Sequence, residues 1–233
     1  MKIRLLYFFL YFYISITSLI AQTSTFSIAL NQDNAFGFAP AVYGSFNVKE
    51  KFDFTYYGIF WTNHAYTNEG GDAWTETGIG LGFTALQEKA YINPSLGFTH
   101  GSLLSNSPSG NFGEGIVPSV VAFYADEKLE TELYFGYYKA LRDGGNSADF
   151  ILYWAYPGYI FSDKFSAGLH YEQFYLTRDD SGISENQYQW LGAYVKFSAG
   201  DKYTFRFSFG DNLGNNPLYS GSYYKLGVFV PLL

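Results

Sequence analysis

Ionisable side chains recur on the polar face of segments in which polar and apolar residues alternate along this 233-residue chain. The members of this set carry opposite charges or a titratable imidazole: Asp53, Glu130, Glu132, His170, Glu172, Lys196, Arg206 and Lys225. Such side chains can bind a polar solute, form ion pairs that fill an interior, or exchange protons. Alternation with a period of two indicates β-strands whose two faces meet different surroundings.

The acidic and basic members of this set lie on different parts of the chain but at similar distances from the nearest turns. Glu132 and Arg206 each lie four residues from a turn, His170 and Lys196 lie six residues from theirs, and Lys225 lies about as far from the end of its strand. In a closed β-structure, side chains at one depth face one another across the interior. Two interpretations follow: the charges form ion pairs that plug a narrow interior, or they line a polar constriction that selects solutes.

Five acid–lysine pairs set the length of the elements that carry these side chains. The lysines follow one another at intervals of 36 to 39 residues, each at a turn between two aromatic-rich alternating segments. The pairs are Glu50-Lys51, Glu88-Lys89, Glu127-Lys128, Asp163-Lys164 and Asp201-Lys202. That interval fits two strands of about 10–13 residues with a tight turn and a longer loop, and such strands can cross roughly 25–30 Å of hydrocarbon.

Taking these pairs as turns predicts twelve strands. They cover residues 25–32, 36–48, 52–63, 75–86, 90–100, 115–125, 129–139, 149–161, 165–177, 188–198, 203–211 and 222–233. The connections 64–74, 101–114, 140–148, 178–187 and 212–221 are longer and rich in Gly, Asn, Asp and Ser. Pro94 and Pro157 fall near the middle of predicted strands, where a missing N–H breaks the hydrogen-bond ladder, so we expect a bulge or a strand boundary at each.

The composition favours a membrane β-barrel over a soluble one. Aromatic residues make up 22% of the chain and charged residues only 15%, against about 25% in an ordinary soluble domain. We therefore predict an all-β fold over residues 22–233: an antiparallel transmembrane β-barrel of about twelve strands, with short periplasmic turns and longer extracellular loops. A lipocalin-like soluble barrel also alternates, but its aromatic side chains point inward.

The first segment has the features of a signal peptide. Lys2 and Arg4 precede the apolar run Leu5–Leu19, and Ala21-Gln22 offers a cleavage point, so we assign residues 1–21 to the signal and the mature protein to the Gram-negative outer membrane. Without these two basic residues, 12 basic and 21 acidic residues leave a net charge of −9, which argues against nucleic acid as a partner. The expected partners are membrane lipids, lipopolysaccharide and small polar solutes.

Several aromatic residues lie on the same face of the predicted strands as the charged residues. We expect Tyr43, Tyr57, Trp61, Tyr134, Tyr138, Tyr153 and Tyr194 to point inward. They could form a stacking track for sugars or apolar solutes, or they could simply fill the interior.

Catalysis has weaker support, and we predict that the protein is not an enzyme and needs no cofactor. A lipid hydrolase could use His100 with Ser102 or Ser105, but no spacing motif supports this arrangement. His170 and Glu172 share one face and are interpreted as a packed pair rather than a base and its orienting group. Asp179-Asp180 could contact Ca²⁺, but a solvated loop explains it as well. The chain has no cysteine, which excludes disulfides and thiolate sites.

Several short stretches resemble a family of Bacteroidetes-type outer-membrane barrels known only by a domain-of-unknown-function label. They are Asn31-Gln32-Asp33 with Gly37-Phe38, Tyr57-Gly58-Ile59-Phe60-Trp61-Thr62, Gly113-Glu114-Gly115-Ile116-Val117-Pro118 and Tyr188-Gln189-Trp190-Leu191-Gly192. The resemblance covers the mature chain and implies location and fold, not activity. From the residues themselves we expect a narrow channel or small-solute binding barrel, with a lipid-modifying enzyme and a non-transporting, partner-binding envelope barrel as alternatives.

Overall fold

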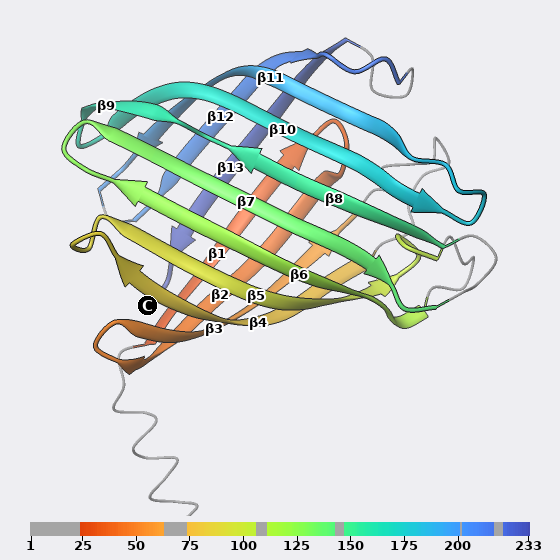
Figure 1. Ribbon diagram of the computed structural model, residues 1–233. Helices are drawn as coiled ribbons and strands as arrows, with labels where there is room; N and C mark the ends of the chain where they lie inside the picture. Colours follow the sequence, from red (N-terminus) through yellow and green to blue (C-terminus); the bar gives the residue numbers. More distant parts are fainter. Residues whose placement is uncertain (1–23, 63–73, 106–110, 143–146, 201, 217–220) are drawn as a thin grey trace, which may run out of the picture.

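The computed structural model describes residues 24–62, 74–105, 111–142, 147–200, 202–216 and 221–233, and these form one closed antiparallel β-barrel (Figure 1). The predicted signal peptide, residues 1–21, lies outside the described residues. The strands are β1 (Ser24–Asp33), β2 (Gly37–Lys49), β3 (Phe52–Trp61), β4 (Trp74–Ala85), β5 (Ala90–Gly101), β6 (Asn111–Ala125), β7 (Leu129–Ala140), β8 (Ala148–Ala155), β9 (Gly158–Ser162), β10 (Phe165–Asp179), β11 (Glu185–Ser198), β12 (Thr204–Asn212) and β13 (Ser222–Pro231).

Pairing of the first strand with the last closes the barrel. β1 pairs with β13 as well as with β2, so no edge is left at the seam. β8 and β9 both lie between β7 and β10, so the thirteen segments occupy twelve positions around the barrel. The predicted twelve-stranded antiparallel barrel is therefore confirmed.

The two mid-strand prolines behave differently. β8 ends and β9 begins around Pro157, whose carbonyl oxygen accepts a hydrogen bond from the Leu169 N–H at 2.9 Å, so the boundary predicted there is confirmed. The same prediction is wrong at Pro94. β5 continues through this residue, which pairs with Val120 of β6, and the register to β4 is the same on both sides of it. Only the hydrogen-bonded pairs between β4 and β5 at this level are missing, because proline has no N–H to donate.

The short turns and the longer connections lie at opposite ends of the barrel. The four short turns from β2–β3 to β9–β10 gather at the left of Figure 1, where the described chain also ends. In one of these turns, Asp126 Oδ1 accepts the backbone N–H groups of Lys128 and Leu129, each at 2.8 Å. These bonds, with a weaker contribution from the Tyr124 hydroxyl, lower the pKa of Asp126 to about 2.

Apolar side chains cover the outer face of the barrel. Residues that alternate with the inward positions are large, hydrophobic and exposed: Ile79, Leu81, Leu133, Phe135, Leu169, Leu191, Val195, Phe205 and Phe207. An exposed apolar surface of this extent needs an apolar medium or partner around it. In the part of the chain that the structure describes, no helix has the length and hydrophobicity to cross a membrane.

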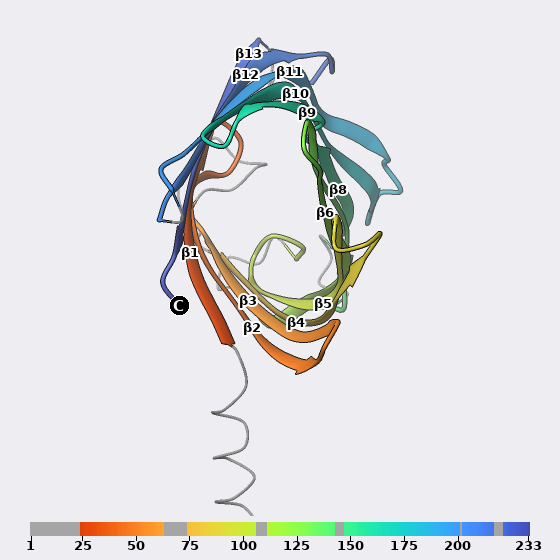
Figure 2. The same ribbon diagram turned by 90° about the vertical axis from the view of Figure 1, so that its left-hand side faces the viewer.

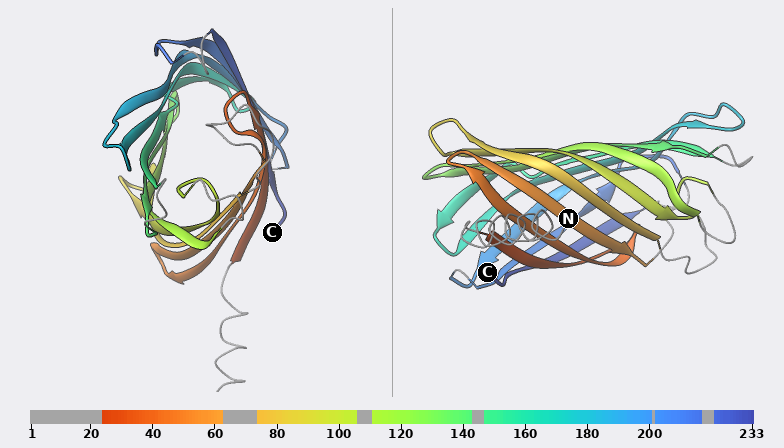
Figure 3. Two further views of the ribbon diagram at one scale, coloured as in Figure 1. Left: turned by 90° about the vertical axis from the view of Figure 1, so that its right-hand side faces the viewer. Right: turned by 90° about the horizontal axis from the view of Figure 1, so that it is seen from below.

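Two short segments fold into the barrel at the end that carries the longer connections. One is the turn between β1 and β2, which contains Phe36, and the other follows β5 and contains Leu103 and Leu104 (Figures 2 and 3). These three side chains are at most 4% exposed and pack with inward aromatic residues from the surrounding strands. The interior is therefore filled at the loop end.

Candidate functional site in the barrel interior

Glu132 and Arg206 form an ion pair inside the barrel. Arg206 Nη1 donates to Glu132 Oε2 at 2.6 Å, and the Trp154 indole N–H donates to Glu132 Oε1 at 3.1 Å. The Arg206 guanidinium also lies 3.9 Å from the centre of the Tyr156 ring, a cation–π contact. The pair joins β7 to β12, so the two residues that the turn spacing placed at one depth meet across the interior.

A second pair joins Glu130 of β7 to Lys196 of β11. The carboxylate also accepts the Ser166 hydroxyl at 2.6 Å and the Tyr194 hydroxyl at 2.8 Å. At this level β9 and β10, which lie between β7 and β11, carry Gly158 and Gly168 at inward positions, and this allows the contact. A Cβ at Gly158 would lie only 1.9 Å from the Tyr194 hydroxyl oxygen. Glycine therefore leaves the space through which these side chains reach Glu130.

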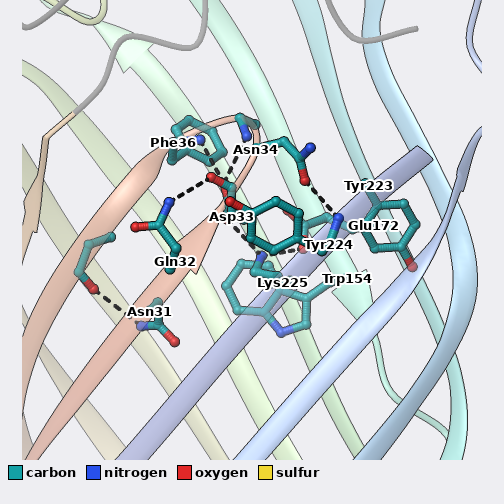
Figure 4. A network of polar contacts seen from close by, with 12 residues as sticks. Asn31, Gln32, Asp33, Asn34, Phe36, Trp154, Glu172, Tyr223, Tyr224 and Lys225 are labelled. Carbon is teal, nitrogen blue, oxygen red and sulfur yellow. Dashed lines mark hydrogen bonds and ion pairs between the residues drawn. The ribbon is translucent and has the colours of Figure 1, made fainter. Parts of the chain in front are cut away.

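A third group gathers around Glu172 of β10, which is fully buried. Its carboxylate accepts from Lys225 Nζ at 2.5 Å and from the Tyr188 hydroxyl at 2.7 Å, and it lies 3.3 Å from His170 Nε2. Lys225 also lies 3.7 Å from Asp33 Oδ2, so one ammonium group bridges two carboxylates (Figure 4). His170 therefore pairs with Glu172, and not with Lys196, whose depth it shares.

Asp33 connects this group to the inward-folded turn between β1 and β2. Its Oδ1 accepts the N–H groups of Ala35 at 2.9 Å and Phe36 at 2.7 Å, a bonding pattern that Asp commonly makes in turns. Asp33 is not among the interior residues that the sequence predicts. The signal was present, because an Asp-Asn pair between two alternating segments favours this type of turn.

Glu114 fixes the second inward segment in the same way. Its carboxylate accepts the backbone N–H groups of Leu103 at 3.0 Å, Leu104 at 3.2 Å and Ser105 at 3.2 Å, and also the Ser105 hydroxyl at 2.9 Å. Glu114 is completely buried. Nothing in the sequence pointed to this role, because the residue lies in a predicted loop next to two glycines.

The other end of the interior is hollow. Phe123 and Phe229 point inward near the short-turn end, and Tyr43 points inward at the middle of β2; their exposed fractions are 44%, 43% and 36%. Trp190 and Phe174, which also point inward at the loop end, are each 1% exposed. Solvent therefore reaches the inner wall at the short-turn end and is excluded from it at the loop end.

The remaining predicted positions are distributed between these regions. Asp53 faces inward close to the short turns, where it accepts from Asn47 Nδ2 at 3.1 Å, away from the three groups described above. Tyr138 and Tyr194 are buried, so they fill the interior. The prediction that Tyr153 points inward is wrong. Its neighbour Trp154 occupies the inward position on β8, and Tyr153 points outward, where its hydroxyl donates to Gln173 Oε1.

His100 and the two serines lie in different environments. His100 Nδ1 accepts the Gly113 N–H at 2.9 Å on the outer side of the barrel, and its ring stacks on Phe112 at 4.4 Å. Ser102 and Ser105 are 3% and 4% exposed and belong to the inward segment, where Ser105 donates to Glu114. Among the described residues no hydrogen bond joins His100 to either serine, the contact that a nucleophile–base pair requires.

The adjacent loop acids support separate turns. Asp179 Oδ1 accepts the Ile183 N–H at 2.7 Å, whereas Asp180 accepts both the N–H and the hydroxyl of Ser147. In the described ranges, no cluster of three or more His, Cys, Asp or Glu side chains could hold a metal ion.

Comparisons with known proteins agree with this architecture. The model of a family of unknown function, DUF6733, matches residues 1–232. The chain is similar in structure to the KdgM porin (TM-score 0.53, 12% identity, covering 89% of this chain and 99% of that one), to the COG4313 outer membrane channel from Pseudomonas putida F1 (0.52, 10%, 91% and 96%) and to the NanC porin (0.52, 11%, 89% and 100%). No curated protein matches the chain in sequence. At these identities the similarity shows a shared fold, that of porin-like outer-membrane barrels.

Proposed function

Because the chain belongs to DUF6733, a family of unknown function, we propose its function from the barrel itself: a narrow outer-membrane channel or small-solute binding barrel whose solute enters the hollow short-turn end. The observation that carries this proposal is the exposed inner wall at Tyr43, Phe123 and Phe229, next to the Glu132–Arg206 pair. A polar solute could exchange hydrogen bonds with that pair and stack on the aromatic rings.

The structural neighbours support a channel. KdgM is a porin that was also solved in complex with oligogalacturonate, and a barrel of twelve strands encloses more space than the roughly eight whose interior side chains fill completely. In this chain the loop end is closed by Phe36, Leu103 and Leu104. Passage therefore requires the two inward segments to move, which makes the channel a gated one.

The cellular setting follows from the apolar outer face. We place the barrel in the outer membrane of a Gram-negative cell, with cleavage of residues 1–21 near Ala21-Gln22 and the short turns on the periplasmic side. Membrane lipids and lipopolysaccharide would contact the outer face. The Bacteroidetes-type origin that the resemblance implied stays a prediction.

One observation favours a second candidate function. The packed loop end, with Leu104 and Tyr188 completely buried, suits an envelope barrel that transports nothing and presents its loops to a partner. The geometry at His100 gives no comparable support for a lipid-modifying enzyme.

Planar-bilayer recording on refolded protein distinguishes the two candidates. We expect discrete conductance steps in the wild type, and a changed step size when Glu132→Gln and Arg206→Gln are combined so that no buried charge loses its partner. Glu185→Gln, at the exposed start of β11, is the control and should leave the steps unchanged. A silent wild type under all voltages would rule out the channel and leave a barrel that transports nothing, one that either binds a small solute or presents its loops to a partner.

A further inference from the structure

Two inward acids, Glu76 and Asp53, have no basic partner among the described residues, and of these two only Glu76 is buried. Glu130, Glu132, Glu172 and Asp33 each form a salt bridge with Lys or Arg. Glu76 accepts only the hydroxyl groups of two tyrosines, Tyr57 at 2.7 Å and Tyr138 at 3.1 Å, and it is 1% exposed. Among the residues that the structure describes, no salt bridge includes it. A buried carboxylate without a counter-charge is costly, so either a proton or a cation must accompany it.

The neighbouring polar groups are also incomplete. Thr99 pairs with Glu76 across β4 and β5, faces inward and is completely buried, yet its hydroxyl has no hydrogen-bond partner in the described part of the barrel. Trp74 lies two residues before Glu76 on the same face of β4. Its buried indole N–H likewise has no partner among the described residues. Buried polar groups are rarely left unpaired in folded proteins, so a bound solute would account for both.

The surfaces around Glu76 are aromatic. Trp61 stacks on Trp74 with ring centres 5.0 Å apart, and the Tyr134 hydroxyl lies 3.3 Å from that of Tyr138. Aromatic faces combined with one carboxylate are the surroundings that recognise ammonium groups. They suit an inorganic divalent ion poorly, because such ions prefer several oxygen ligands.

The charge of the interior favours the same class of ligand. At the inward-facing strand positions that the structure describes, the carboxylates are Asp33, Asp53, Glu76, Glu130, Glu132 and Glu172, and the cations are Lys196, Arg206 and Lys225. Six negative charges against three positive ones give a net charge of −3 with His170 neutral. A wall of this sign attracts cations and repels polyanions.

From these observations we infer that the barrel binds a small organic cation, with Glu76 as the counter-ion of its ammonium group. The inference rests on the proposed function in that the ligand enters from the hollow end. Tyr43, which is partly exposed at the middle of β2, pairs across the strands with Tyr57, which in turn donates to Glu76. A ligand oxygen such as a hydroxyl would accept the free Trp74 N–H, and Thr99 would complete the polar contacts.

Tryptophan fluorescence tests binding independently of transport, because all four tryptophans, residues 61, 74, 154 and 190, lie on inward positions. Choline chloride, titrated against sodium chloride at constant ionic strength, should give a saturable change in the refolded wild type. Glu76→Gln should weaken the apparent affinity about tenfold or more, and Thr99→Val less. Glu185→Gln, the same substitution at an exposed position, should bind as the wild type does.

The outcomes separate this inference from the proposed function. A saturable choline response that Glu76→Gln weakens about tenfold or more supports the cation site even if bilayers stay silent, in which case only the channel fails. A wild type without any saturable response overturns the site, since a protonated Glu76 would need no counter-ion. In conducting bilayers under a KCl gradient, the reversal potential should show preference for K⁺ over Cl⁻, and anion preference would also overturn the inference. Barrel circular dichroism of each variant shows that it has folded.

Discussion

The two ends of the barrel interior share one wall of alternating strands, yet side chains fill the loop end and leave the short-turn end hollow. Phe174 at the loop end and Phe229 at the short-turn end both point inward, but their exposed fractions are 1% and 43%. Strand pattern alone therefore does not decide whether a barrel is open. The difference arises from the two inward segments, which Asp33 and Glu114 hold in place through backbone N–H groups.

The largest expected effect contrasts these two phenylalanines. Phe174→Ala should lower the free energy of unfolding by about 3–5 kcal/mol, because it leaves a cavity in a packed core. Phe229→Ala, the same change at an accessible inward position, should cost less than half as much. Urea unfolding in detergent micelles measures both, and equal losses would show that the two ends are packed alike.

Releasing the inward segment after β5 should have the next largest effect. Glu114→Gln removes the charge that accepts three backbone N–H groups and the Ser105 hydroxyl, so we expect a loss of about 1–3 kcal/mol in unfolding free energy. It should also increase the probability of conducting events in bilayers by loosening the closed end. Glu185→Gln serves as the control. Unchanged conductance with reduced stability would mean that this segment is not the gate.

A change in a short turn should affect stability without touching either end of the interior. Leu86, Gln87 and Glu88 all have positive φ angles, with Gln87 at 57°. Residues other than glycine adopt such angles at a cost in conformational energy. Gln87→Gly should therefore raise the unfolding free energy by up to about 1 kcal/mol, whereas Gln87→Ala should not. A gain in conductance from this glycine variant would contradict the assignment of gating to the loop end.

The smallest effect concerns the turn at Asp126 and its dependence on pH. Its pKa in the folded barrel, about 2, is below the ordinary value of 3.8, so its contribution to stability is complete above pH 4 and disappears as the pH falls towards 2. The difference in unfolding midpoint between wild type and Asp126→Asn should therefore shrink over that interval. A difference that stays constant from pH 5 to pH 2 would show that the turn does not depend on the carboxylate charge.

The sequence was sufficient for the strands because their signals are local. Alternation and the acid–lysine turns depend on neighbouring residues only, so most predicted strand ends agree with the structure to within a few residues. Glu132 and Arg206 could be predicted to lie at the same depth in the barrel, because the number of residues from the nearest turn sets the depth of a strand residue. The bulge or boundary predicted at Pro94 is absent, because β4 and β5 keep their register without the cross-strand pairs beside this residue.

The inward segments could not be predicted in this way. Leu103 and Leu104 are buried by contacts with distant strands, and Glu114 binds backbone groups that any sequence carries. The closed loop end follows from that packing, and the lack of a basic partner for Glu76 follows from which side chains the distant strands bring to it. Neither leaves a periodic trace in the sequence.

The position of Lys225 has a consequence for how the barrel assembles. Lys225 belongs to the last strand and lies directly opposite Asp33 on the first, across the seam that closes the sheet. A slip of two residues at this seam would keep every side chain on its proper face but would move the ammonium about 7 Å along the strand. The contact with Asp33 would then be lost, whereas Glu172, which connects to Lys225 through β11 and β12, would keep its partner. The contact between Lys225 and Asp33 therefore stabilises the observed register at the seam relative to a shifted one.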